Sequence, residues 1–119
     1  MPTIQQLISY LRTNNHIGHN NPITARNLAL YFNISDGGVE VAIRSVIRNA
    51  IEQGELVGSC NRGFYIIDNR NEIEHNLNSL RSRAENIIHR RRNLMNDWND
   101  QPNQNNPTNL PNLRIIEGD

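Results

Sequence analysis

The segment from Thr24 to Ile67 constrains the fold more than any other part of the chain, because three patterns follow one another without a break. Residues 24–34 and 35–54 each place apolar side chains at the spacing of one helix face. Residues 56–67 hold two β-prone runs on either side of Asn61-Arg62-Gly63, which is suited to a turn. The order predicts two helices joined by a tight turn and followed by a β-hairpin.

The ends of both helices carry recognisable signals. Thr24 and Ser35 are the predicted N-caps, because their hydroxyl oxygens can accept the N–H groups that a helix start leaves unpaired. Asn33 tolerates the left-handed conformation that ends a helix, and Gly54 ends the next one. The second helix, Ser35–Gln53, has a broad apolar stripe made of Val39, Ala42, Ile43, Val46, Ile47, Ala50 and Ile51.

Another helix is predicted before this unit, capped by Thr3 and ending near Asn14. Its apolar face consists of Ile4, Leu7, Ile8 and Leu11. A polar loop follows, and Pro22-Ile23 is extended. Three helices this short cannot bury their apolar faces without the hairpin packed against them, so residues 1–67 are expected to form one domain.

Residues 68–98 follow a different pattern, a heptad stripe on one long helix. Its members are Ile73, Leu77, Leu80, Ala84, Ile87, Arg91, Leu94 and Trp98. Such a helix is about 42 Å long, and a partner helix is the simplest way to bury so narrow a stripe. The sequence therefore favours a homodimer, with Arg91 reducing stability and setting register or oligomeric state. The alternative is a helix folded back on its own domain.

Residues 99–119 are rich in Asn and Pro and are expected to form a disordered tail. Four aliphatic residues nevertheless gather in Leu110–Ile116. This segment could dock on a protein partner, pack on its own protein, or have no role.

The formal net charge is zero, and all 12 cations are Arg. This balance argues against a strongly basic nucleic-acid binder, although one face can be basic when the total is not. A single Cys and the absence of a signal segment or a membrane-spanning apolar run favour an intracellular, cytoplasmic protein.

The outward positions of helix Ser35–Gln53 are candidates for reading DNA in the major groove. Arg44 could contact guanine, Glu40 could accept from cytosine, and Arg48 is better placed for phosphate. The full candidate set is Thr24, Arg26, Ser35, Gly37, Gly38, Glu40, Val41, Arg44, Ser45, Arg48 and Arg62. Thr24 and Arg26 would hold phosphate at a helix start, and Arg62 would act from the hairpin tip. The alternative is a solvated face with scattered charges.

The sequence gives little support for a metal site or a catalytic site. His16 and His19 lack a third metal ligand, His75 and His89 lie off the heptad stripe, and Cys60 is expected to be a small buried residue. No nucleophile, base and acid arrangement and no phosphate-binding Gly loop is present in the sequence. We therefore expect no cofactor, no metal and no enzymatic activity.

Three motifs in the sequence are similar to motifs of a known protein family. These are Ser35-Asp36-Gly37-Gly38-Val39 at a helix start, Gly54 at its end, and Gly63-Phe64-Tyr65 in the closing strand. Residues 1–67 resemble winged helix-turn-helix domains, and the run to Trp98 looks like small phage or prophage-type transcriptional regulators. The resemblance implies a mainly α fold with a small hairpin wing, and double-stranded DNA as partner. The chain departs from those regulators at Gly37-Gly38, where they commonly carry polar or basic side chains, and in lacking Lys and net positive charge.

The leading hypothesis from the sequence is thus a dimeric DNA-binding regulator. The first alternative is a protein-interaction module, such as a phage accessory or inhibitor protein, that uses the same fold or its tail. The second is a phage packaging or replication component with an oligomerising helix.

Overall fold

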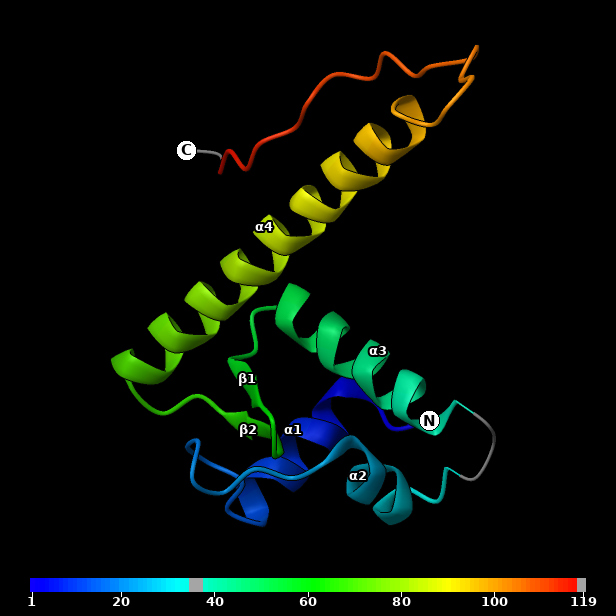
Figure 1. The fold of residues 1–119 in the computed structure, drawn as a ribbon. Coiled ribbons are helices and arrows are strands. Elements are labelled where there is room, and N and C mark those ends of the chain that lie inside the picture. The colour runs from blue at the N-terminus through cyan, green and yellow to red at the C-terminus, as the bar shows by residue number, and fades with distance from the viewer. Residues whose placement is uncertain (35–37, 118–119) are drawn as a thin grey trace. The chain divides into compact units, whose positions relative to one another are not determined.

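The computed structural model describes residues 1–34 and 38–117, and its elements follow the predicted order (Figure 1). The described part is mainly helical, with an antiparallel two-stranded hairpin and a long C-terminal helix, as the sequence predicts. The elements are α1 (Ile4–Thr13), α2 (Ala25–Tyr31), α3 (Val39–Glu52), β1 (Val57–Cys60), β2 (Gly63–Ile66) and α4 (Arg70–Asn99).

The predicted caps of α1 and α2 are confirmed. The Thr3 hydroxyl accepts the Gln6 N–H, and the Gln6 side chain accepts the Thr3 N–H in return, which completes a capping box. The Thr24 hydroxyl accepts the N–H of Asn27. Asn33 has a φ of 58°, so the chain turns in the left-handed region just after α2, as predicted.

The predicted start of the third helix is wrong. α3 begins at Val39, and its N-cap is Gly38 with a left-handed φ of 86° that is not helical. Glycine adopts this conformation without the clash that a Cβ atom would cause. Gly38 therefore precedes the helix, and Ser35 and Gly37 lie outside the described residues.

The core lies between α1, α2, α3 and the hairpin. It is made of Leu7, Ile8, Leu11, Ile23, Ala25, Leu28, Ala29, Ile43, Val46, Ile47, Ala50, Val57 and Ile66. Of the described side chains in the predicted stripe of α3, Ala42 is half-buried and Ile51 is 50% exposed. Ile51 lies in the last turn of α3 outside the buried core, so its place in the stripe is corrected.

Strand β2 has neighbours on both sides. Its register with β1 pairs Val57 with Ile66 and Cys60 with Gly63. On its other edge, Ile23 and Phe64 exchange two backbone hydrogen bonds of 2.9 and 2.8 Å. The predicted extended conformation at Ile23 is therefore confirmed, and this pairing joins the loop before α2 to the hairpin.

The chain divides into two compact units, residues 1–76 and 77–119. The first unit thus extends beyond the predicted boundary at residue 67 and includes the first turns of α4. The second unit contains the rest of α4 and the tail. The tail has no helix or strand up to residue 117, and it runs back beside α4, to which it is hydrogen-bonded (Figure 1).

Candidate nucleic-acid interface

Helix α3 carries five of the eleven residues that the sequence predicts to contact DNA. Glu40, Val41, Arg44 and Arg48 are exposed, whereas Ser45 is half-buried at the edge of the outward face. Because Ile43, Val46, Ile47 and Ala50 are buried on the other side, these four exposed side chains have to face solvent. The helical periodicity therefore places them together, as the sequence predicts.

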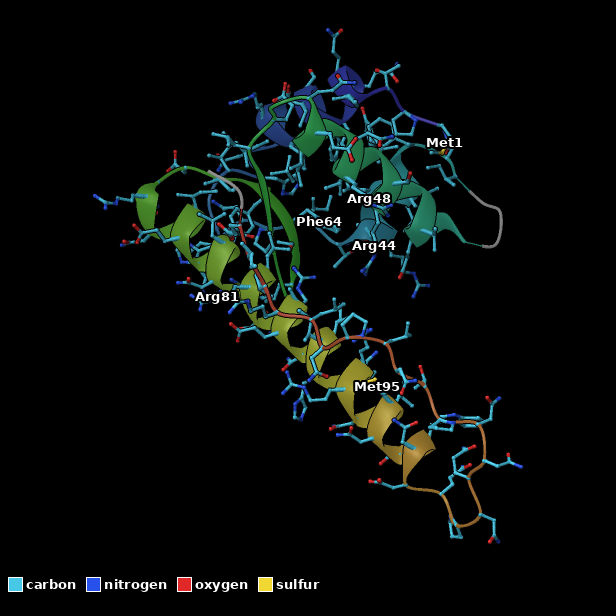
Figure 2. The ribbon with its side chains drawn as sticks, turned by 90° about the horizontal axis from the view of Figure 1, so that it is seen from above. Met1, Arg44, Arg48, Phe64, Arg81 and Met95 are labelled. Carbon is cyan, nitrogen blue, oxygen red and sulfur yellow. The ribbon has the colours of Figure 1, made fainter. Side chains whose placement is uncertain are left out.

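Arg44 and Arg48 stand one turn apart on this face (Figure 2). Residues four apart on a helix are surface neighbours, about 6 Å between Cβ atoms. No salt bridge in the described part of the chain includes either guanidinium. The two positive charges are therefore adjacent and available to an anion.

Thr24 and Arg26 lie at the start of α2, and both are exposed. The Thr24 hydroxyl oxygen accepts the Asn27 N–H at 3.1 Å, so its established role is that of a helix cap. Contact of either side chain with phosphate stays a prediction.

Arg62 lies in the hairpin turn as predicted, but its side chain is engaged. Its Nη2 atom donates to the backbone carbonyl of His19 at 3.1 Å. The turn of the hairpin is thereby tied to the loop of residues 16–21. Arg62 keeps further N–H donors, since a guanidinium has five.

The carboxylate of Glu72, whose role the sequence does not predict, makes three hydrogen bonds in the first unit. Its side chain is only 5% exposed. Oε2 accepts the backbone N–H of His19 at 2.9 Å and lies 2.6 Å from His19 Nδ1, while Oε1 accepts the Asp68 N–H at 2.8 Å. Because an ionised carboxylate only accepts hydrogen bonds, Nδ1 of His19 carries the proton. The signal in the sequence was Asn69 three residues before Glu72, the spacing of a capping box.

The environment of Glu72 also changes its ionisation. Burial on its own raises the pKa of this carboxyl, but the hydrogen bonds from the His19 side chain, the His19 N–H and the Asp68 N–H outweigh burial. The pKa of Glu72 is lowered from 4.5 to about 2. The carboxylate is therefore charged at neutral pH and holds the start of α4 on the loop of residues 16–21.

Asn76 makes a second connection between α4 and the hairpin. Its Oδ1 accepts the Ser59 N–H at 2.9 Å, and its Nδ2 donates to the Tyr65 hydroxyl at 2.9 Å. Beside it, a cleft of about 430 Å³ is lined by His19, Cys60, Asn61, Arg62, Tyr65, Asn69, Asn71, Glu72 and His75. Cys60 is half-buried rather than buried, which corrects the expectation from the sequence. Within the described ranges, no three His, Cys, Asp or Glu side chains are grouped so that they could hold a metal ion.

The heptad stripe of α4 is open in the second unit. Leu77, Leu80, Ile87 and Leu94 are each between 55% and 65% exposed. Trp98 is also exposed, Ile73, Ala84 and Arg91 are half-buried, and His75 and His89 are exposed off the stripe, as expected. The stripe therefore presents a row of aliphatic side chains to solvent.

Comparison with protein-family models, curated proteins and solved structures finds no match to this chain. In the part of the chain that the structure describes, no helix is both long and apolar enough to cross a membrane.

Proposed function

We propose that this protein is a dimeric DNA-binding regulator of the winged helix-turn-helix type. The observation that carries the proposal is the pair of adjacent guanidiniums of Arg44 and Arg48 on the solvent face of α3, neither of which forms a salt bridge with another described residue. Arginine makes bidentate contacts with guanine and with phosphate, so such a pair suits a helix in the major groove. The protein would act as a binding protein rather than as an enzyme.

The arrangement around α3 supports this function. α2 packs directly against α3, as the first helix of a helix-turn-helix does, and the hairpin follows α3 in the chain. The pairing of Ile23 with Phe64 adds a short third segment to the hairpin, beside β2. Val41 is 68% exposed near the start of α3 and is suited to an apolar contact with a thymine methyl group. The protein would work in the cytoplasm, that of the host cell if the chain is viral.

The first test removes the two arginines one at a time. Arg44→Ala and Arg48→Ala are each expected to weaken binding to a selected DNA site about tenfold or more, because each loses a contact to base or phosphate. The site is obtained by selection from a random DNA library with the purified protein, and affinity is measured by gel shift at fixed salt concentration.

Arg12→Ala is the matched control, because it removes the same charge from an exposed position on α1. It is expected to leave affinity within about twofold, since a distant surface charge acts only through a screened potential. Unchanged binding by both Arg44→Ala and Arg48→Ala would show that α3 is not the reading helix.

Pairing of α4 with a second copy of the chain completes the proposal. The heptad positions recur from Ile73 to Trp98, which is more than three heptads, and the exposed members include Leu77, Leu80, Ile87 and Leu94. A symmetric dimer reads an inverted repeat whose half-sites lie one or more helical turns apart. A palindrome in the selected DNA would support this.

Leu80→Glu tests the pairing. A charge placed at the middle of a buried stripe has to be desolvated, so the variant is expected to be monomeric at concentrations where the natural chain is dimeric. Asn78→Glu, two residues earlier and off the stripe, is the control and is expected to leave the mass unchanged. Sedimentation velocity measures both, and equal masses for the two variants would argue against this stripe as the interface.

A second function, binding of a protein partner, is favoured by an exposed apolar patch on α1 and α2. Leu30 and Tyr31 are exposed, and the Tyr31 ring lies 4.1 Å from that of Tyr10 between centroids. Exposed apolar patches often mark interaction sites. Failure of the library selection to enrich any DNA, even at low salt, would favour this function over the first.

A further inference from the structure

The second unit carries two adjacent apolar rows on α4. The first is the heptad stripe, in which Leu80, Ile87 and Leu94 occupy d positions. The second row contains Ile88 and Met95, which are seven residues apart and follow Ile87 and Leu94 directly at e positions. Both rows together make α4 apolar at a, d and e in its C-terminal half, apart from Arg91 at an a position.

The tail covers the second row and leaves the first open. Ile88 and Met95 are half-buried, whereas their neighbours Ile87 and Leu94 are exposed. Ile88 shares a cleft with Leu113 and Ile115 of the tail. Met95 lies on the stretch of α4 along which the tail returns (Figure 2).

Specific hydrogen bonds fix the tail in this position. Asn99 and Thr108 exchange two of them, in which Asn99 Oδ1 accepts the Thr108 N–H at 2.9 Å and Asn99 Nδ2 donates to the Thr108 carbonyl at 3.2 Å. Trp98 Nε1 donates to the Asn106 carbonyl at 3.0 Å. The contacts are made by side chains of the last turn of α4, so the position of the tail is encoded in the helix itself.

The tail also engages the one charged member of the heptad stripe. Arg91 Nη1 donates to the backbone carbonyl of Pro111 at 3.1 Å, and the residue is half-buried. Its guanidinium is thus held at the flank of the stripe. This lowers the cost that the sequence assigns to an arginine at this position, because the charge does not have to enter the pairing surface.

We propose that the tail, residues 101–117, limits α4 to pairing with a single second copy of this chain. A helix that is apolar only at a and d forms a two-stranded seam, whereas one that is apolar at a, d and e is suited to the core of a larger bundle. With the tail in place, α4 presents the narrow seam. Without the tail, Ile88 and Met95 widen the apolar face of α4.

The partner that pairs with the heptad stripe is a second copy of the chain, because identical stripes are complementary to each other about a two-fold axis. The inference rests on the pairing of α4 proposed above.

The test compares the full chain with a chain that ends at Asp100, by light scattering coupled to gel filtration. The full chain is expected to contain two copies and the shortened chain three or four. A shortened chain that also carries Ile88→Gln and Met95→Gln is expected to return to two copies, because the second row is then polar. A full-length variant with residues 101–117 replaced by Gly and Ser is the control for chain length and is expected to behave like the shortened chain.

The outcomes separate this inference from the proposed function. If both the full and the shortened chain contain two copies, the tail does not limit assembly, and the proposed dimer is unaffected. If the full chain is monomeric and the shortened chain dimeric, the tail blocks pairing instead, and the inference is overturned. If both chains are monomeric, α4 does not pair, and the proposed dimer is overturned together with this inference. DNA contact by α3 is tested separately by the Arg44 and Arg48 variants.

Discussion

Replacement of Gly63 by alanine is expected to lower the free energy of unfolding by about 3 kcal/mol or more, the sum of backbone strain and overpacking. Gly63 has a φ of 130°, which side chains of L residues rarely adopt. A Cβ atom built there lies 2.2 Å from the Ile23 carbonyl oxygen and 2.8 Å from the Thr24 nitrogen, and both belong to backbone that cannot turn aside as a side chain can. Since the Ile23–Phe64 pairing runs through this contact, the loop before α2 would separate from the hairpin. Urea unfolding followed by circular dichroism measures the loss.

Gly54→Ala is the matched control. Gly54 also has a positive φ, of 95°, but a Cβ atom there meets nothing within 4 Å. The control therefore isolates the conformational cost, about 1–2 kcal/mol. If both variants lose the same stability, the close approach between Gly63 and Ile23 does not matter, and the arrangement of the loop beside β2 would have to be revised.

These two glycines show what could be predicted from the sequence. The neighbours of Gly63 in the chain predict a turn, and those of Gly54 predict the end of a helix, and both predictions depend on local sequence alone. The contact of Gly63 with Ile23 depends on a pairing between residues 41 positions apart in the sequence. Composition and periodicity carry no information on which extended segment adds to which strand, so the severity of the Gly63 substitution follows only from the structure.

For the candidate interface, too, some features could be predicted from the sequence and others could not. The exposure of Arg44 and Arg48 could be predicted, because the buried stripe of α3 determines its opposite face. The start of α3 could not, since the Ser-Asp pair and the glycine at position 38 are both ordinary helix-start signals and only the backbone angle of Gly38 decides between them. The composition of the tail predicts disorder, and it gives no sign of the hydrogen bonds that the side chains of Trp98 and Asn99, in the last turn of α4, make to the tail backbone.

The role of Glu72 does not follow from the sequence, because its partner His19 is distant in the chain. His19 lies 53 residues earlier, and the pattern around Glu72 is that of an exposed helix start. A carboxylate with a pKa lowered to about 2 stabilises the folded state above the ordinary pKa of 4.5, and this contribution is lost as the pH falls from about 4.5 to 2. The shift corresponds to about 3 kcal/mol at neutral pH.

Glu72→Gln is therefore expected to destabilise the protein by about 3 kcal/mol at pH 7, the stabilisation that the lowered pKa represents, and by little at pH 2, where the natural carboxyl approaches neutrality itself. The measurement is the urea midpoint and slope of both proteins at several values between pH 7 and pH 2. Glu74→Gln makes the same chemical change two residues later, at an exposed Glu that pairs with Arg70 across one helical turn, and should cost less than about 1 kcal/mol at any pH. A difference between the natural chain and Glu72→Gln that stays constant from pH 7 to pH 2 would mean that the lost stability comes from packing and not from the charge. If the difference in stability between the natural chain and Glu72→Gln disappears between pH 7 and pH 2, while that for Glu74→Gln does not change with pH, the Glu72 carboxylate is the charged link between the start of α4 and the loop that carries His19.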